Sequence, residues 1–152
     1  MEKLSFRSYT DEDFPFFQQL VLASKEWESE ECSAENLPAY LKKYEMLQGH
    51  WTIYEQSGEK VGLSYSLPWA PSNEKPWLGT LLVKKSRRGQ GIGKEIITQI
   101  AEHFQGNHKA FFCACPVERT GWLQFLASCG FEQFKVEKNE EEKEYVILVY
   151  PL

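Results

Sequence analysis

The sequence lacks a long apolar run. No stretch of its 152 residues is long and apolar enough to span a bilayer, and no signal peptide precedes the first predicted strand. We therefore expect a protein with no membrane partner. The length suits one domain with a proper core, so we expect a single domain over residues 1–152.

Cysteine and histidine lack the spacing of a disulfide framework or a metal site. The four cysteines show no disulfide-framework spacing, which favours a reducing, cytoplasmic location. Cys113 and Cys115 place two thiols on one face of a strand, but this spacing is not the Cys-x₂-Cys of a zinc knuckle. The three histidines are scattered without paired spacing. We therefore expect no metal.

Positive charge is in the minority. The chain has 17 Lys and Arg against 22 Asp and Glu, a formal net charge of −5. This balance disfavours nucleic acid or an anionic membrane as the main partner. It is compatible with a cationic substrate.

The most informative segment runs from Leu81 to Lys94. An apolar strand ends at Val83, a short basic loop follows, and glycines occupy positions 89, 91 and 93. Apolar residues then recur at helical spacing: Ile92, Ile96, Ile97, Ile100 and Phe104. The first N–H groups of a helix have no intrahelical partner, and the helix dipole favours negative charge there. The segment therefore predicts an anion-binding loop, with an ordinary glycine turn as the simpler alternative.

The spacing of the glycines distinguishes this loop from two other phosphate loops. Walker A requires four residues between its glycines, and the dinucleotide fingerprint requires Gly-x-Gly-x-x-Gly. The segment instead contains Arg88-x-x-Gly91-x-Gly93 after a strand that ends in valine. This pattern resembles the acetyl-CoA-binding motif of the GCN5-related N-acetyltransferases, the GNAT family.

The resemblance implies acetyl-CoA as co-substrate. The loop amides are then expected to hold the CoA pyrophosphate, with added charge from Arg88 and from Arg87 or Lys94, and the preceding strand to hydrogen-bond the pantetheine arm. The implied cofactor-binding residues are Leu81, Leu82, Val83, Arg88, Gly89, Gln90, Gly91, Ile92, Gly93 and Lys94.

Hydrophobic patterns predict the remaining elements. Strands are expected at 4–9, 51–56, 60–67, 77–83 and 109–115, followed by two strands around 137–142. Helices are expected after Thr10, Asn36, Gly91 and Pro116. Thr10 is the expected N-cap of the first helix, with the acid Asp13 at the third position. Glu26–Glu35 is an acidic segment. The order βααβββαβαββ indicates an α/β fold. It is similar to the whole GNAT fold, a mixed, mostly antiparallel sheet of about seven strands flanked by helices.

The chemistry that the resemblance implies is acetyl transfer from acetyl-CoA to a primary amine of a small molecule or peptide. The backbone N–H of Val83 is expected to stabilise the oxyanion. Many relatives carry a tyrosine as general acid where this chain has Leu126. The helical spacing of Leu126 with Trp122 and Cys129 indicates a core residue instead.

The sequence leaves several candidates for the general base that deprotonates the amine. Tyr65 is expected either to orient the amine through water or to be a core tyrosine. Four acidic residues border the expected acceptor side, and each is either a candidate base or a solvated surface charge: Glu28, Glu30, Glu31 and Glu74. Of these, Glu28 is the catalytic candidate. The amine can also lose its proton to solvent.

Two further alternatives concern turnover and assembly. Leu126 and the lack of an acid in the strand at 77–83 favour, as the alternative, an acyl-CoA-binding or regulatory module with little turnover. Nothing in the sequence pins a histidine near Cys115, so direct attack in a ternary complex is expected rather than an acetyl-cysteine intermediate. The sequence leaves room for a homodimer.

Overall fold

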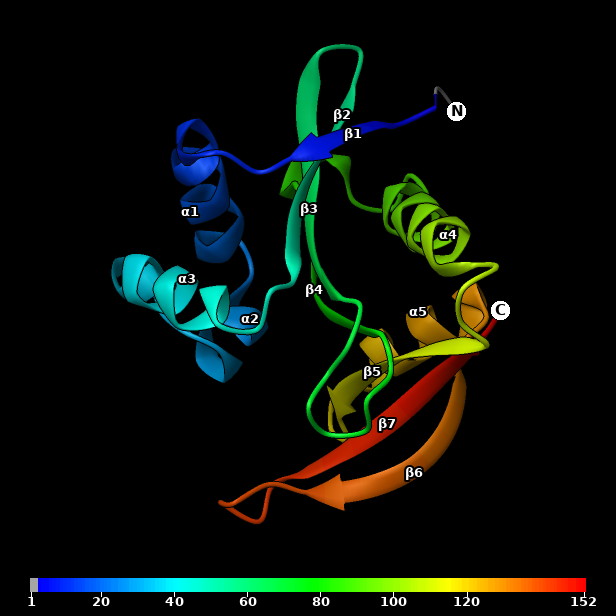
Figure 1. Cartoon of the computed structure of the whole chain (residues 1–152). Coiled ribbons are helices and arrows are strands. Elements are labelled where there is room, and N and C mark those ends of the chain that lie inside the picture. The colour runs from blue at the N-terminus through cyan, green and yellow to red at the C-terminus, as the bar shows by residue number, and fades with distance from the viewer. Residues whose placement is uncertain (1–2) are drawn as a thin grey trace. The chain divides into compact units, whose positions relative to one another are not determined.

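The computed structural model describes residues 3–152 (Figure 1). The strands are β1 (Ser5–Ser8), β2 (His50–Gln56), β3 (Glu59–Leu67), β4 (Trp77–Val83), β5 (Ala110–Pro116), β6 (Glu132–Lys138) and β7 (Glu144–Pro151). The α-helices are α1 (Phe14–Leu22), α2 (Lys25–Glu30), α3 (Leu37–Glu45), α4 (Ile92–Phe104) and α5 (Thr120–Cys129). Short 3₁₀ turns cover Asp11–Asp13 (η1), Ala34–Asn36 (η2) and Lys85–Arg87 (η3).

The seven strands form a mixed sheet in the order β1-β2-β3-β4-β5-β7-β6. The pairs β1–β2, β2–β3, β5–β7 and β6–β7 are antiparallel, and β4 pairs with β5 in parallel where Trp77 lies opposite Phe112. This confirms the predicted α/β fold with its mostly antiparallel sheet flanked by helices. One difference lies in the acidic segment, where Lys25–Glu30 forms the additional helix α2. Its single buried residue, Trp27, is too little to produce a helical pattern in the sequence.

The chain divides into two compact units. The first contains the residues up to Leu67 together with Thr80–Ile96, and the second contains Pro68–Gly79 and Ile97–Leu152. Each unit has a core of its own. The expectation of a single domain stays a prediction.

The core of the first unit is built around an aromatic cluster, which we define as Phe17, Trp27, Tyr40, Tyr44, Trp51 and Tyr65. The Phe17 side chain is fully buried, and its ring lies 5.1 Å from that of Trp51 and 5.8 Å from that of Trp27. These rings come from α1, α2, α3, β2 and β3. Because each ring buries a large apolar area, the cluster fixes three short helices against two strands.

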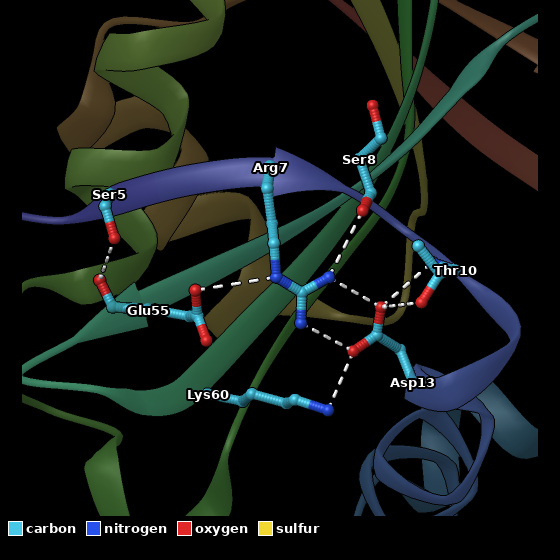
Figure 2. Close-up of polar contacts among 7 residues, drawn as sticks. All are labelled: Ser5, Arg7, Ser8, Thr10, Asp13, Glu55 and Lys60. Carbon is cyan, nitrogen blue, oxygen red and sulfur yellow. Dashed lines mark hydrogen bonds and ion pairs between the residues drawn. The ribbon is translucent and has the colours of Figure 1, made fainter.

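A buried carboxylate stabilises the start of the first unit (Figure 2). Asp13 is completely buried and accepts two hydrogen bonds of 2.8 Å from the guanidinium of Arg7. Its carboxylate also lies 2.7 Å from Lys60 Nζ and accepts the Thr10 N–H at 2.9 Å, which confirms the predicted cap. The hydrogen bonds from Arg7, then those from Lys60 and Thr10, hold the pKa of Asp13 well below its usual range.

The second unit packs α5 and the end of α4 around a smaller core. The Phe111 ring is fully buried and lies 4.9 Å from the Tyr150 ring and 5.3 Å from the Phe131 ring. Leu126 is only 1% exposed, which confirms it as a core residue. Gly130 ends α5 with a left-handed φ of 116°, and the Phe131 N–H bonds back to the Leu126 carbonyl.

Candidate cofactor and acceptor site

The glycine loop joins the end of β4 to the start of α4, as predicted. Gly89 and Gly91 have φ values of 76° and 85°, a left-handed conformation that glycine adopts without steric cost. The Glu95 N–H bonds to the Gly91 carbonyl at 3.1 Å and closes the first turn of α4. The amides of Ile92 and Gly93 precede this bond and have no intrahelical acceptor. The loop therefore has the backbone geometry and helix dipole of an anion site.

The backbone N–H and C=O of Val83 point away from β3. The N–H of the next residue, Lys84, bonds to the Val61 carbonyl of β3 at 2.8 Å. Backbone groups of consecutive strand residues point to opposite edges, so the Val83 N–H and C=O point to the other edge of β4. A donor on that edge matches the predicted role of the Val83 N–H.

Arg88 ties the loop to the turn between α1 and α2. Its Nε donates to the Val83 carbonyl at 3.1 Å, while Nη2 donates to the Ala23 carbonyl at 3.1 Å and to Ser24 Oγ at 2.9 Å. Ala23 is the C-terminal cap of α1, where a cation interacts favourably with the helix dipole. The guanidinium thus contacts protein groups at the end of β4 and in the α1–α2 turn, which the motif alone did not indicate.

The neighbouring basic residues contact the β2–β3 hairpin instead. Arg87 donates to Glu59 Oε1 at 2.9 Å, to the side chain of Gln56 and to Gln90 Oε1 at 3.2 Å. Lys84 Nζ lies 3.0 Å from Glu59 Oε2, and this hydrogen bond is the main cause of a lowered Glu59 pKa. The loop is therefore tied to the hairpin by one arginine and to the α1–α2 turn by the other.

Tyr65 lies inside the aromatic cluster. Its side chain is 2% exposed, its ring lies 4.4 Å from that of Trp51, and its hydroxyl donates to the Tyr44 carbonyl at 3.3 Å. Burial raises the pKa of Tyr65, so the phenol stays protonated at neutral pH. Gly49 provides the space for the phenol, because a Cβ at that position would overlap the Cζ and Oη atoms.

The acidic segment contributes two carboxylates of different character. Glu28 Oε2 accepts the Ala34 N–H at 3.4 Å and so helps to hold η2. The Glu31 residue is exposed, but its Oε1 accepts the Tyr40 hydroxyl at 2.8 Å; local desolvation raises the Glu31 pKa, with Glu30 adding to the effect. Glu31 is thus the carboxylate of this segment that lies against the aromatic cluster. The pairing with Tyr40, nine residues away, left no motif in the sequence.

Two residues considered for catalysis lie in the core of the second unit. Leu126 is buried, as described above. Cys115 is fully buried, and its thiol contacts the carbonyls of Pro116 and Arg119 at 3.5 and 3.9 Å. The catalytic roles expected for Tyr65 and Glu28 remain predictions. The cofactor-binding roles expected for the loop residues also remain predictions.

The described residues show neither a metal-binding cluster nor a helix that could span a membrane. Residues 3–152 contain no group of three or more His, Cys, Asp or Glu side chains that could hold a metal ion. In the same range, no helix has both the length and the apolar character needed to cross a bilayer.

Comparison with known proteins identifies the family. The family model described as Acetyltransferase (GNAT) family matches residues 9–131. The chain therefore belongs to the GNAT family of acetyltransferases, whose acyl donor is acetyl-CoA. A Bacillus subtilis (strain 168) protein named "Uncharacterized protein YkzC" is 43% identical over 135 residues, 89% of this chain and 95% of the relative.

Solved structures agree on the fold. An acetyltransferase from Thermus thermophilus superimposes with a TM-score of 0.77 at 17% identity, covering 99% of this chain and 97% of that one. A GNAT family acetyltransferase from Elizabethkingia anophelis with acetyl-CoA bound gives 0.74 at 17% identity and covers 100% of both chains. A chimera of the spermidine N-acetyltransferase SpeG from Vibrio cholerae and hSSAT gives 0.75 at 16% identity, covering 99% and 96%.

Proposed function

We propose that this protein is an N-acetyltransferase that transfers the acetyl group of acetyl-CoA to a primary amine of a small molecule or peptide. The observation that carries the proposal is the left-handed glycine loop between β4 and α4, where glycine backbone and helix N-terminus meet. A structural neighbour with acetyl-CoA bound supports the choice of acyl donor. A spermidine N-acetyltransferase among the neighbours supports an amine as acceptor.

The proposed donor contacts use backbone more than side chains. The amides from Gly89 to Lys94 bind the pyrophosphate, and the edge of Leu81–Val83 that faces away from β3 binds the pantetheine arm. The Val83 N–H stabilises the oxyanion that forms when the amine attacks the thioester carbonyl. Acetyl-CoA supplies an already activated acyl group, so no protein nucleophile is needed.

The proposed acceptor side is the segment from α2 to α3. Its surplus of carboxylates attracts a protonated amine, and Glu31 is the member that contacts the aromatic cluster through Tyr40. Glu28 is a second candidate base. The amine must lose a proton before it attacks, and either carboxylate or solvent accepts it. Tyr65 orients the amine only through an intervening group, because its phenol is buried and bonded to the Tyr44 carbonyl.

The second candidate function is an acyl-CoA-binding module with little turnover. The observation that favours it is the buried Leu126 at the position where many relatives have a tyrosine acid. In that case the leaving thiolate takes its proton from water or is not released at a useful rate.

The experiment that separates the two functions measures binding and turnover on one preparation. Calorimetry with acetyl-CoA reports binding, and release of free thiol reports transfer to a panel of polyamines, aminoglycosides, amino acids and peptides. Thiol release that depends on one class of amine supports the enzyme. Binding without amine-dependent thiol release supports the module, and absence of binding contradicts both.

A further inference from the structure

The Arg88 side chain contacts both sides of the proposed reaction site. Its Nε donates to the Val83 carbonyl at 3.1 Å, and its Nη2 donates to the Ala23 carbonyl at 3.1 Å and to Ser24 Oγ at 2.9 Å. We propose that Arg88 is a positioning residue that couples acetyl-CoA binding at the glycine loop to the placement of α2. The inference rests on the proposed function, which assigns the loop to acetyl-CoA and α2 to the acceptor side.

The first contact of Arg88 lies on the edge of β4 that faces away from β3. The Val83 N–H and C=O point to this edge, and the N–H is the proposed oxyanion donor. A carbonyl has two lone pairs, so the Val83 C=O can accept from Arg88 and also from a pantetheine amide. Arg88 therefore restrains the end of the strand and leaves it able to bind the acyl donor.

The second contact reaches the start of α2. Ser24 is the N-cap residue of this helix, but its hydroxyl makes no cap hydrogen bond and instead accepts from Arg88. The Ser24 carbonyl accepts the Glu28 N–H at 3.0 Å, which begins the hydrogen bonding of α2. Arg88 and the candidate base Glu28 therefore bond to the same residue. A shift of the guanidinium is passed to Glu28 through Ser24 alone.

The third contact gives the guanidinium a favourable electrostatic position. Ala23 is the C-terminal cap of α1, and the last carbonyls of a helix have no intrahelical N–H partner. A cation at this end also interacts favourably with the helix dipole. One nitrogen of Arg88 thus satisfies the end of α1 and holds the start of α2.

Another nitrogen of the guanidinium is available to an anion. Within residues 3–152, Nη1 of Arg88 has no acceptor, and the residue is exposed. A phosphate of acetyl-CoA at the adjacent glycine loop can therefore bond to Nη1 while Nη2 stays on the turn. Because a guanidinium is planar and rigid, fixing one edge also restricts the other. Acetyl-CoA should therefore make the α1–α2 turn less mobile.

The test is amide hydrogen exchange of the full-length chain with and without saturating acetyl-CoA. Exchange at loop residues 89–94 reports binding, and exchange at residues 23–28 reports coupling. In the wild type, acetyl-CoA should slow exchange at residues 23–28 about fivefold or more, although no proposed cofactor contact lies there. Arg88→Lys keeps the charge but cannot bond to the Val83 carbonyl and the turn together, so this slowing should fall below about twofold.

Two further variants separate coupling from binding. Ser24→Ala removes one contact of Arg88 outside the cofactor loop, so it should reduce the slowing at residues 23–28 and keep the acetyl-CoA affinity within about twofold. Arg87→Lys is the matched control, because Arg87 contacts Glu59 in the β2–β3 hairpin, and it should leave the slowing intact. Comparing each variant with and without acetyl-CoA removes any change in its ligand-free stability, which a merely structural role would alter.

The outcomes distinguish this inference from the proposed function. In the wild type, slowing at the loop without slowing at residues 23–28 would overturn the inference, and so would full slowing in Arg88→Lys. Amine-dependent thiol release without coupling would contradict the inference alone. Coupling without amine-dependent thiol release would contradict the enzyme alone. Wild-type protein that does not bind acetyl-CoA would contradict both.

Discussion

The glycine loop and the aromatic cluster, both in the first unit, are built from opposite materials. The loop is made of backbone: two left-handed glycines and the first amides of α4. The cluster is made of side chains, six aromatic rings from five elements between Phe14 and Leu67. The loop contributes little core, whereas Phe17 and Tyr65 are among the most buried side chains of the chain.

This difference separates binding from stability. A substitution in the loop should change affinity for acetyl-CoA with little effect on unfolding, because exposed glycines make few packing contacts. A substitution in the cluster should do the reverse, because packed rings dominate the burial of apolar area. The predictions below test how complete this separation is.

The largest effect is expected for Phe17→Ala. The substitution removes a fully buried ring at the centre of the aromatic cluster and should cost about 3–5 kcal/mol of unfolding free energy. Urea unfolding measures this change, and Phe6→Ala, at a ring that is 67% exposed, is the matched control that should change it little. The affinity of the folded protein for acetyl-CoA should stay within a few-fold. A large loss of acetyl-CoA affinity in folded Phe17→Ala would show that binding and stability are not separate.

The converse change is Gly91→Asp. A carboxylate and a Cβ at a left-handed loop position oppose the pyrophosphate by charge and by volume, so the affinity for acetyl-CoA should fall at least ~100-fold. Calorimetry measures the affinity. Gly58→Asp is the control, because Gly58 also has a positive φ but lies in the β2–β3 turn with open space around it. Equal affinities of the two variants would show that the loop is an ordinary turn.

Gly49→Ala tests the edge of the aromatic cluster. The added methyl would overlap the Tyr65 phenol and lie 2.8 Å from the Ser66 carbonyl oxygen, so overpacking should cost roughly 1–3 kcal/mol. Gly121→Ala, where the methyl meets nothing within 4 Å, is the control. If the two variants melt at the same temperature, the Tyr65 ring is free to move, and its packing role is wrong.

Arg88 and Arg87 connect the loop to different neighbours and give a paired test. Arg88→Ala removes the hydrogen bonds to Ala23 and Ser24 and should increase amide hydrogen exchange at the α1–α2 turn. Arg87→Ala should increase exchange at the β2–β3 hairpin instead. Each change should cost about 1 kcal/mol, since these are hydrogen bonds near the surface. If amide exchange rises at both the α1–α2 turn and the β2–β3 hairpin in both variants, the two arginines do not stabilise separate neighbours of the loop.

The same contrast explains how far the sequence could predict the molecule. The loop was predictable because strand, glycines and helix are contiguous, and local φ and helix-end chemistry are properties of the local sequence. The side-chain contacts of Arg88 with Ala23 and of Glu31 with Tyr40 were not, because they join separate segments. Leu126 was correctly expected in the core from its helical spacing. The helix α2 was missed because six residues with one buried side chain give no period.

The smallest expected effect is the pH dependence of Glu31→Gln. Local desolvation beside Tyr40 raises the Glu31 pKa in the folded protein above its unfolded value, so the unfolded state ionises first as pH rises. Ionised Glu31 therefore costs stability above its folded pKa, and this cost disappears as pH falls below the unfolded pKa, near its ordinary value of about 4.5. Glu31→Gln keeps an acceptor for the Tyr40 hydroxyl without the charge, so its stability relative to wild type should increase from acidic to neutral pH.

Glu35→Gln, at a glutamate on η2 that is exposed like Glu31, is the control for loss of one charge from the acidic segment. Melting temperatures of both variants and wild type across the acidic to neutral range give the comparison. A Glu31→Gln difference that runs parallel to that of Glu35→Gln would mean that Glu31 is an ordinary solvated carboxylate. A difference confined to Glu31 would place an ionisable group of raised pKa in the segment from α2 to α3, where the acceptor amine is proposed to bind.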